Sequence, residues 1–350
     1  MEKIVIERPG GYRRLEIKKF SKPMPRSNEV LVEVSAAGIN FADIFIRLGL
    51  YKSAKEFVGW PITPGFEFSG QVLKCGQDVT DLNEGDRVFG LTRFGAYATH
   101  LCVPREQVFL ILEDSKFTPD QWAAFPAVFL TAYHGLFQNF ALQPGMNILV
   151  HSAAGGVGGA LLQLGKIAGC RMTGVVGSTH KVDTALNYGA DQVIDKSKEN
   201  LWGKARELCP DGYDAVFDAN GPATLKQSYQ HLAPAGKLVA YGFHSMLSTY
   251  WGVPNYFKLL WEYFRVPRWS PLDMTQENKS LMAFNLSFLF HRMDLFQEAM
   301  RDLLKWVEEG KIKAPVVQPF AFEKVADAHR ALESGTTVGK LILKTNADSR

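Results

Sequence analysis

The chain has 350 residues, of which 46% are hydrophobic and 21% charged, the composition of a globular protein with room for two domains. Its formal net charge of +3, without a block of Lys and Arg, gives no reason to expect a nucleic-acid partner. The four cysteines lie far apart, which argues against a disulfide framework and a structural zinc lobe. No apolar run reaches the length of about 18 residues that a transmembrane helix needs, and the first residues lack the apolar core of a signal peptide, so we expect a cytoplasmic location.

The first 125 residues have the sequence pattern of a β-rich domain. Short apolar runs are separated by Gly, Pro, Asn and Asp, and the alternation at 29–34 is typical of a half-buried strand. One helix is predicted after Asn40, because Asn40 is a suitable N-cap and apolar residues follow it at helical spacing.

From about residue 126 the pattern changes to alternating strands and helices. Strands are predicted at 147–151, 171–176, 190–195, 213–218, 237–243 and 282–288. Helices are predicted at 158–169, 180–188, 198–209 and 222–232. Repeated strand–helix units imply an α/β fold with a doubly wound parallel sheet that has helices on both faces.

The interval 244–281 interrupts this alternation and is rich in aromatic residues. After it, the pattern predicts an amphipathic helix at 294–309, a second helix at 325–333 and a closing strand at 340–344. The predicted domain boundaries are residues 125 and about 290.

The stretch HSAAGGVGGA, residues 151–160, follows an apolar strand and opens a predicted helix. A dinucleotide-binding turn carries small residues at its first, third and sixth positions, which are Ala153, Gly155 and Gly158 here. Together with Gly156 and Val157, they would hold a pyrophosphate at the helix N-terminus, where the dipole favours an anion. The position between a strand and a helix predicts nucleotide binding; a tight turn without a ligand is the alternative.

The residues after this turn favour NADP(H) over NAD. An NAD site has an acidic residue about 20 positions further on, which holds the ribose 2′-hydroxyl. No Asp or Glu occurs from residue 151 to residue 182. Instead, Ser178, Lys181 and Lys196 follow the second and third predicted strands and suit a 2′-phosphate. The alternative is that Lys181 is a solvated residue at the start of a helix.

A β-rich domain followed by this turn resembles the medium-chain dehydrogenase/reductase superfamily, many members of which hold a catalytic zinc ion. Their ligands include a cysteine and the histidine of a Gly-His-Glu triplet, and the matching stretches here are 35–40 and 64–67. The cysteine is absent and Phe66 replaces the histidine, so Glu67 and Asp43 alone would not provide three protein ligands. We therefore expect no metal ion.

Longer matches resemble the zinc-free quinone oxidoreductase branch of this superfamily over essentially the whole chain. The motifs that carry the resemblance lie at 36–43, 47–51, 64–70, 85–88, 130–134 and 151–158. Within the branch, residues 40–43, the aromatic insertion and the ending at 338–340 look most like the homologues of the synaptic vesicle amine transport protein. One departure is Lys196, where quinone oxidoreductases often place a tyrosine near the 2′-phosphate.

The resemblance implies a GroES-like domain formed by 1–125 and 291–350, and a Rossmann domain at 126–290 that carries the insertion at 244–281. It also implies a homodimer and places Thr131 beside the nicotinamide. Asn220, Gly242 and Phe243 follow predicted strands and are expected at the carboxyl edge of the sheet, where open α/β folds bind ligands.

Hydride transfer from NADPH to a quinone or another α,β-unsaturated carbonyl compound builds negative charge on an oxygen. A metal-free site must stabilise this charge with hydrogen-bond donors or an acid. Tyr51 is the first candidate because its phenol is both; Asn40 could donate its amide, and Asp43 could orient a donor or a water. The alternatives are that Asn40 and Asp43 only cap a helix and that Tyr51 fills a domain cleft. Arg47 either holds a phosphate or faces solvent.

Within the insertion, Phe257, Trp261 and Phe264 recur at helical spacing, and basic residues flank them. Such a stripe is most often core or dimer interface, but it could also line a substrate pocket or contact a membrane surface. The second hypothesis is therefore a lipid- or membrane-surface-binding protein that keeps the reductase fold with weak or no catalysis.

Overall fold

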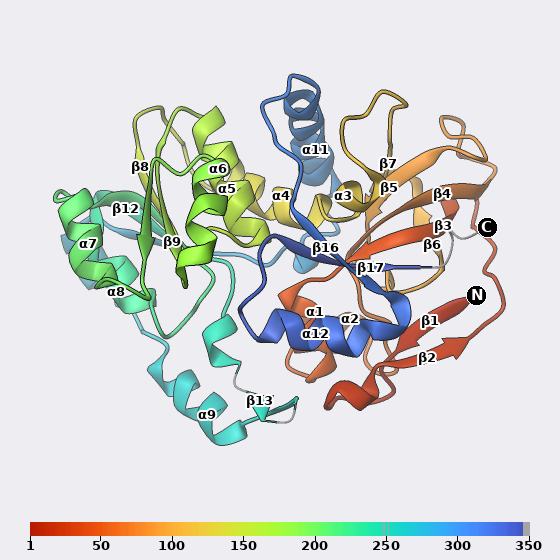
Figure 1. Ribbon diagram of the computed structural model, residues 1–350, viewed down its shortest axis with the longest axis horizontal. Coiled ribbons are helices and arrows are strands. Elements are labelled where there is room, and N and C mark those ends of the chain that lie inside the picture. Colours follow the sequence, from red (N-terminus) through yellow and green to blue (C-terminus); the bar gives the residue numbers. More distant parts are fainter. Residues whose placement is uncertain (248, 251, 346–350) are drawn as a thin grey trace.

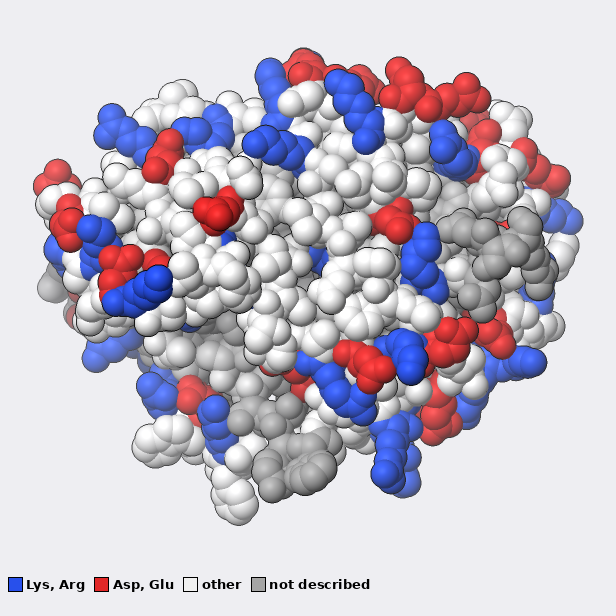
Figure 2. All heavy atoms as spheres, viewed as in Figure 1, with Lys and Arg blue, Asp and Glu red and all other residues white. Residues whose placement is uncertain are grey.

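The computed structural model describes residues 1–247, 249–250 and 252–345. Two sheets form the two halves of the molecule, which lie side by side along its long axis in Figure 1. Basic and acidic side chains are interspersed on the face drawn in Figure 2, in keeping with the small net charge of +3. Ser248 and Trp251 of the predicted insertion lie outside the described residues, as do the last five residues, 346–350, of the predicted range 291–350.

The sheet in the second half of the chain is parallel throughout, with the strand order β10-β9-β8-β11-β12-β15. Its strands are β8 (Asn147–Val150), β9 (Arg171–Val176), β10 (Gln192–Asp195), β11 (Tyr213–Asp218), β12 (Leu232–Ala240) and β15 (Ser280–Ala283). The helices between the first five are α5 (Gly156–Ile167), α6 (Val182–Asn187), α7 (Leu201–Leu208) and α8 (Leu225–Gln230). Later strands lie on both sides of β8, so the predicted doubly wound Rossmann sheet is confirmed.

The last strand of this sheet differs from the prediction of a strand at 282–288. β15 ends at Ala283, and a short 3-10 helix follows at Leu286–Phe288. The Asn285 side chain accepts a hydrogen bond from the Ser287 backbone N–H at 3.0 Å, which favours a turn over an extended strand. The turn places Asn285 at the carboxyl edge of the sheet.

The second sheet combines both ends of the chain. Its strands are β3 (Glu29–Gly38), β4 (Glu67–Cys75), β5 (Arg87–Leu91), β6 (His100–Pro104), β7 (Val108–Leu110), β16 (Val317–Ala321) and β17 (Lys340–Lys344), and a separate hairpin contains β1 (Glu2–Val5) and β2 (Glu16–Lys19). β17 pairs antiparallel with β3, so the C-terminal strands complete the sheet begun by the N-terminal ones. Val32, Phe68 and Leu341 are buried in their shared core. This half confirms the β-rich GroES-like part of the predicted fold class.

Helices α3 (Pro119–Ala123), α4 (Pro126–Tyr133) and α11 (Met293–Glu308) lie between the two sheets (Figure 1). Phe129 of α4 and Phe296 and Met300 of α11 are buried in one apolar core that extends to the parallel sheet. Burial of side chains of this size contributes about 1.5–3 kcal/mol each to folding. The predicted boundaries at residues 125 and 290 stay predictions, and the contact between α4 and α11 crosses the second of them.

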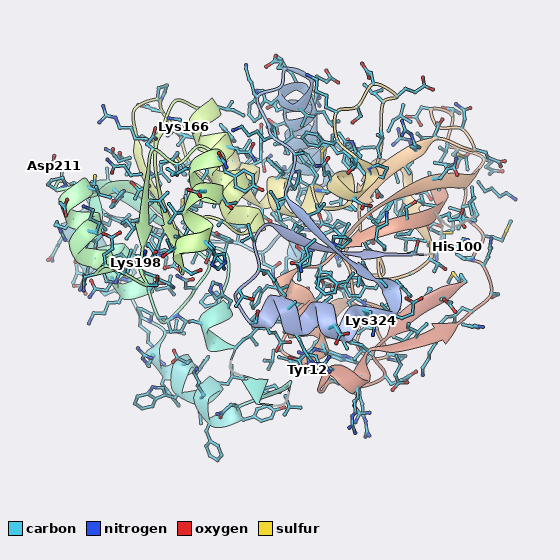
Figure 3. All side chains as sticks on the ribbon, in the orientation of Figure 1. Tyr12, His100, Lys166, Lys198, Asp211 and Lys324 are labelled. Carbon is cyan, nitrogen blue, oxygen red and sulfur yellow. The ribbon has the colours of Figure 1, made fainter. Side chains whose placement is uncertain are left out.

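The insertion contains a hairpin of β13 (Thr249–Tyr250) and β14 (Val253–Pro254), followed by α9 (Tyr256–Arg265) and α10 (Pro271–Glu277). α9 lies at the lower edge of the molecule in Figure 1, and Figure 3 shows ring side chains extending from it away from the body. Phe257, Trp261 and Phe264 are 89%, 64% and 67% exposed, so the predicted stripe is not part of the core of this chain. No described helix has both the length and the apolar character needed to span a bilayer.

Arg47 holds this hairpin against the β-rich half. Its guanidinium is fully buried, donates to the carbonyl oxygens of Gly10 (3.0 Å) and Gly252 (2.6 Å), and forms an ion pair with Glu333. The ring of Tyr12 lies 4.4 Å from the guanidinium carbon. The expectation that Arg47 faces solvent is therefore wrong, and its terminal donors are engaged by the protein itself.

Candidate active site between the two halves

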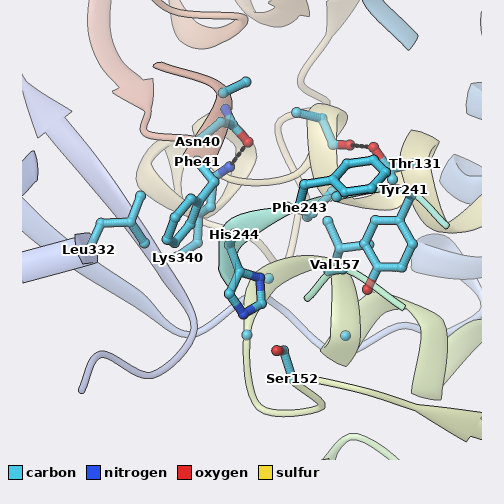
Figure 4. Close-up of a pocket in the computed structure, with 18 of the residues that line it drawn as sticks. Asn40, Phe41, Thr131, Ser152, Val157, Tyr241, Phe243, His244, Leu332 and Lys340 are labelled. Atoms are coloured by element: carbon cyan, nitrogen blue, oxygen red, sulfur yellow. Dashed lines mark hydrogen bonds between the residues drawn. The ribbon is translucent and has the colours of Figure 1, made fainter. Parts of the chain in front are cut away.

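A cleft of about 1030 Å³ lies at the carboxyl ends of the parallel strands. The β-rich half contributes residues from the region after β3, including α1 (Phe41–Arg47), and from the start of β17. The other half contributes the loops after β8, β9, β10, β11, β12 and β15. Figure 4 shows side chains of both halves around the same space. This edge is where open α/β sheets bind their ligands.

The glycine-rich turn joins β8 to α5 on the wall of the cleft. Gly158 must be glycine, because a Cβ there would lie 2.3 Å from the carbonyl oxygen of Ser152. Ser152 adopts a left-handed backbone with φ 55° and Ala153 does not, so alanine is accommodated at the first position of the turn. Ala153 is buried and does not line the cleft. The other predicted residues of the turn, Gly155, Gly156, Val157 and Gly158, do line it.

Two lysines lie at the end of the cleft nearest β9 and β10. Lys181 and Lys196 both line it, and burial together with the charge of Lys196 lowers the pKa of Lys181. Lys181 Nζ donates to the carbonyl oxygen of Gly335 at 2.6 Å. Within the described part of the chain, neither lysine forms an ion pair with a carboxylate. Their charge makes this end of the cleft suitable for an anionic group. Ser178 does not line the cleft, although the neighbouring Gly177 does.

A buried carboxylate fixes the loop that carries Asn220, which lines the cleft. Asp218, at the end of β11, is fully buried and accepts hydrogen bonds from the backbone N–H groups of Asn220 (2.8 Å) and Gly221 (3.2 Å). The hydroxyls of Thr224 and Ser228 donate to its other oxygen, each at 2.7 Å. Asp218 is absent from the predicted site, although an acidic residue at the end of a buried strand is a signal for such a role.

The middle of the cleft is lined by Thr131, Gly242, Phe243 and His244. The Thr131 hydroxyl donates to a carbonyl oxygen of its own helix at 2.6 Å, which leaves its lone pairs free to accept. Burial lowers the pKa of His244 to about 4, so this imidazole is neutral at pH 7. Its ring centroid lies 5.5 Å from that of Phe41 (Figure 4). This part of the cleft therefore presents neutral and mostly flat groups.

Asn40 occupies the N-cap position of α1 and lines the cleft, and both ends of its side-chain amide are engaged. Its Nδ2 donates to Glu67 Oε1 at 3.0 Å, and Lys340 Nζ donates to its Oδ1 (Figure 4). Lys340 also forms a buried ion pair with Glu67 at 2.6 Å. Lys340 lines the cleft but is absent from the predicted site, because no local pattern in β17 indicates that its side chain contacts Glu67.

Asp43 is fully buried and does not line the cleft. Its carboxylate accepts hydrogen bonds from the backbone N–H groups of Asn40 and Gly65, each at 2.8 Å. Burial raises the pKa of Asp43 to about 7 despite these hydrogen bonds. The carboxylate positions Asn40, and a direct catalytic role for Asp43 stays a prediction that its position does not support.

Tyr51 lines the cleft, where its ring centroid lies 5.9 Å from that of Phe66. Its hydroxyl oxygen lies 3.0 Å from Asn285 Oδ1 and 3.2 Å from Ser287 Oγ. Burial raises the pKa of Tyr51, so the phenol is protonated at neutral pH. Asn285 and Ser287 are absent from the predicted site because only folding brings them to Tyr51.

Phe66 stands where zinc-dependent members of the superfamily have a histidine, and Glu67 beside it is engaged by Lys340. Among the residues that the structure describes, no group of three His, Cys, Asp or Glu side chains could hold a metal ion.

Two family models match the chain. A zinc-binding dehydrogenase model matches residues 188–343, and an alcohol dehydrogenase GroES-like domain model matches residues 26–113. The synaptic vesicle membrane protein VAT-1 homolog of Danio rerio is 33% identical over 343 residues, which cover 98% of this chain and 69% of the relative. A quinone oxidoreductase-like protein 2 homolog of Nematostella vectensis is 30% identical over 335 residues, which cover 93% of this chain and 84% of the relative.

Solved structures similar to the chain include both kinds of relative. The Escherichia coli quinone oxidoreductase complexed with NADPH matches with a TM-score of 0.84 and 28% identity, covering 98% of this chain and 100% of that one. The human VAT-1 homolog-like protein matches with a TM-score of 0.81 and 29% identity, covering 98% of each chain. Each match therefore includes both sheets and the cleft between them.

Proposed function

Because the chain belongs to the medium-chain dehydrogenase/reductase family, in the branch of VAT-1 homologues and quinone oxidoreductases, we propose that it is an NADPH-dependent oxidoreductase. It transfers a hydride to a quinone or another α,β-unsaturated carbonyl compound without a metal ion. The observation that carries the proposal is the cleft, which joins a phosphate-binding turn and two adjacent lysines to an apolar end with hydrogen-bonding side chains.

The nucleotide end of the cleft fits NADPH. The pyrophosphate fits the N-terminus of α5, whose first N–H groups have no partners within the helix. Lys181 and Lys196 fit the 2′-phosphate, because the Lys181 ammonium uses one of its three N–H groups on the Gly335 carbonyl oxygen and keeps two for a ligand. The complex of the Escherichia coli quinone oxidoreductase with NADPH supports this choice. When bound, the cofactor supplies the hydride, and the chain supplies position and electrostatics.

The other end of the cleft fits a flat, apolar acceptor. Its apolar lining consists of Phe45, Leu50, Phe66, Leu91 and Phe290. As the hydride adds to a carbon of the acceptor, electron density moves to the carbonyl oxygen, where hydrogen-bond donors stabilise it. Tyr51 and Asn40 are the predicted donors. NADPH, one proton from solvent and the acceptor give NADP+ and the reduced acceptor.

The experiment is an NADPH oxidation assay on the purified protein with 1,2-naphthoquinone, an enone and an aldehyde. We expect steady, acceptor-dependent consumption of NADPH with the quinone or the enone. Gly158→Ala is expected to abolish it, because the new Cβ would collide with the backbone of the phosphate-binding turn. If no acceptor gave turnover above background, the reductase function would be wrong.

The exposed face of α9 favours a second function, attachment to an anionic membrane surface. Phe257 and Trp261 are 89% and 64% exposed, and Lys258 and Arg265 lie on the same helix. An amphipathic helix with aromatic residues on one face and basic residues beside them is typical of interfacial binding. The relative from Danio rerio is named as a homolog of the synaptic vesicle membrane protein VAT-1, which supports this proposal.

Sedimentation with phosphatidylserine-containing vesicles tests the membrane function. We expect binding that weakens in Trp261→Ser and in Lys258→Glu and that is lower with vesicles of phosphatidylcholine alone. Leu112→Ser is the matched control, because Leu112 is 48% exposed and lies outside the insertion. Equal sedimentation of all variants, or none with either vesicle, would rule out attachment through α9.

A further inference from the structure

We propose that the side-chain amide of Asn285 is the group that hydrogen-bonds the acceptor oxygen during hydride transfer, and that Tyr51 is a positioning residue that orients this amide. The inference rests on the proposed reductase function and names the donor of the same site. It changes the role predicted for Tyr51 from acid to positioning residue.

The position of Asn285 in the sheet places it at the acceptor end of the cleft. Asn285 follows β15, which is one edge strand of the parallel sheet, whereas Lys196 follows β10, which is the opposite edge strand. The phosphate-binding turn follows β8, between these two edges. A dinucleotide that extends along the carboxyl edge from the lysines across the turn therefore points its other end towards β12 and β15. Asn285 lines the cleft there, together with Tyr51 and Phe290.

The hydrogen bonds of Asn285 identify the oxygen of its side-chain amide as the end that the protein engages. Three groups surround its Oδ1, namely the Tyr51 hydroxyl at 3.0 Å, the Ser287 backbone N–H at 3.0 Å and the Ser287 hydroxyl at 2.8 Å. A backbone N–H can only donate, so it identifies the atom it contacts as the oxygen of the amide. Ser53 Oγ lies 2.8 Å from Ser287 Oγ and extends this arrangement into α2 (Lys52–Phe57).

The nitrogen of the same amide is available to a ligand. Asn285 is an exposed residue on the wall of the cleft, and its Nδ2 has no hydrogen-bond partner among the described residues. Donors on the oxygen withdraw electron density from the amide and strengthen its N–H groups as donors. The arrangement therefore presents an oriented N–H pair to the space in which the acceptor oxygen would lie.

Three other side chains of the cleft, Tyr51, Asn40 and Thr131, already donate within the protein. The Tyr51 hydroxyl has one proton, which is used on Asn285 or Ser287, and burial raises the pKa of Tyr51. Asn40 donates one of its two N–H groups to Glu67, and Thr131 donates its one hydroxyl proton to a carbonyl oxygen of its own helix. Direct donation by Tyr51 would break a bond between the two halves of the molecule, whereas donation by Asn285 breaks none.

The chemistry needs a donor here but no acid. The hydride of NADPH forms a new C–H bond at the carbon conjugated to the carbonyl, and the π electrons move to the oxygen to give an enolate or a hydroquinone anion. Asn285 stabilises this oxygen by hydrogen bonding and keeps its protons, while water supplies the proton that completes the product. An amide does not titrate in the working range, so its contribution is independent of pH.

A double-mutant cycle in the NADPH oxidation assay tests the assignment, with an acceptor that the wild type reduces. We expect Asn285→Ala to lower kcat about 100-fold, the effect of losing one oxyanion donor, with the KM for NADPH unchanged. Tyr51→Phe should lower kcat by a smaller factor, because the backbone N–H and the hydroxyl of Ser287 still orient the Asn285 amide. The double variant should be no slower than Asn285→Ala, since Tyr51 acts through Asn285. Asn83→Ala, at an exposed asparagine outside the cleft, is the matched control.

Asn285→Asp gives a readout that a merely structural role would not change. A carboxyl group donates a hydrogen bond only while protonated, so the kcat of this variant should fall with rising pH through the pKa of the new carboxyl. A larger loss in Tyr51→Phe than in Asn285→Ala, losses that multiply in the double variant, or an Asn285→Asp profile parallel to the wild type would each overturn the assignment. A wild type without turnover that still binds NADPH, shown by NADPH fluorescence, would overturn the reductase function itself.

Discussion

His329 is a buried histidine that makes the fold sensitive to acid. It is fully buried in α12 (Val325–Glu333), and neither ring nitrogen has a hydrogen-bond partner among the described residues. Burial and the nearby charge of Arg47 lower its pKa to about 3, whereas a histidine in an unfolded chain has a pKa of about 6.5. Between these two values the unfolded chain binds the proton more tightly, so the free energy of unfolding falls as the pH falls.

His329→Leu should remove this dependence. As the pH falls from about 6.5 towards 3, we expect the free energy of unfolding of the variant to rise relative to that of the wild type by up to about 1.4 kcal/mol per pH unit. Urea unfolding at a series of pH values measures the shift, and His291→Leu at an exposed histidine is the matched control. A stability difference that stays constant over this range would contradict the account.

Single residues were predictable where their role is local. The need for glycine at Gly158 depends on the backbone of the same turn. The absence of Asp and Glu from the segment before Lys181 is visible in the sequence itself. The roles of Lys340 and Asn285 depend on contacts with Glu67 and Tyr51, which are more than 200 residues away in sequence. No spacing rule predicts such contacts, because the contact of Lys340 is set by the position of β17 in the β-rich sheet and the contact of Asn285 by the packing of the two halves.

Arg47 joins the hairpin of β13 and β14 to α12, because it donates to the Gly252 carbonyl oxygen and forms a buried ion pair with Glu333, the two side chains being 0% and 8% exposed. Arg47→Met keeps much of the apolar stem but removes the buried guanidinium that contacts Glu333 and the Gly252 carbonyl oxygen, and breaking such a buried pair should cost about 3–5 kcal/mol of stability. Lys204→Met is the matched control, because its pair with Glu207 is exposed and should change stability by about 0–1 kcal/mol. Equal unfolding free energies for the two variants in urea would show that the buried pair does not hold the insertion.

At the level of elements, the spacing of hydrophobic residues predicted which segments are helices and which are strands. It did not predict which surface each apolar face contacts. It predicted a helix through Phe257 and Trp261, but the direction of that apolar face depends on which surface the helix meets. The same spacing predicted that the last parallel strand continues to residue 288. It does so because hydrophobic spacing gives no sign of the turn that the Asn285 side chain starts.

The whole molecule consists of two sheets with a cleft between them, and both sheets contribute residues to the site in the cleft. The β-rich half supplies Tyr51, Asn40 and Lys340, and the parallel sheet supplies the glycine-rich turn and Asn285. A ligand that fills the cleft therefore contacts both halves and stabilises their arrangement in proportion to its affinity. A homodimer and a cytoplasmic location stay predictions.

Cofactor choice in the acceptor assay tests the central claim most directly. The measurement is kcat/KM for NADPH and for NADH in the wild type and in the Lys181→Ala/Lys196→Ala double variant. Two charge-assisted contacts to the 2′-phosphate are worth about 1.5–3 kcal/mol each, so we expect the double variant to lose at least about 100-fold with NADPH and little with NADH. Lys198→Ala, at an exposed lysine that does not line the cleft, should leave both values unchanged. Equal use of NADPH and NADH by the wild type, or no acceptor-dependent oxidation of either, would contradict the account.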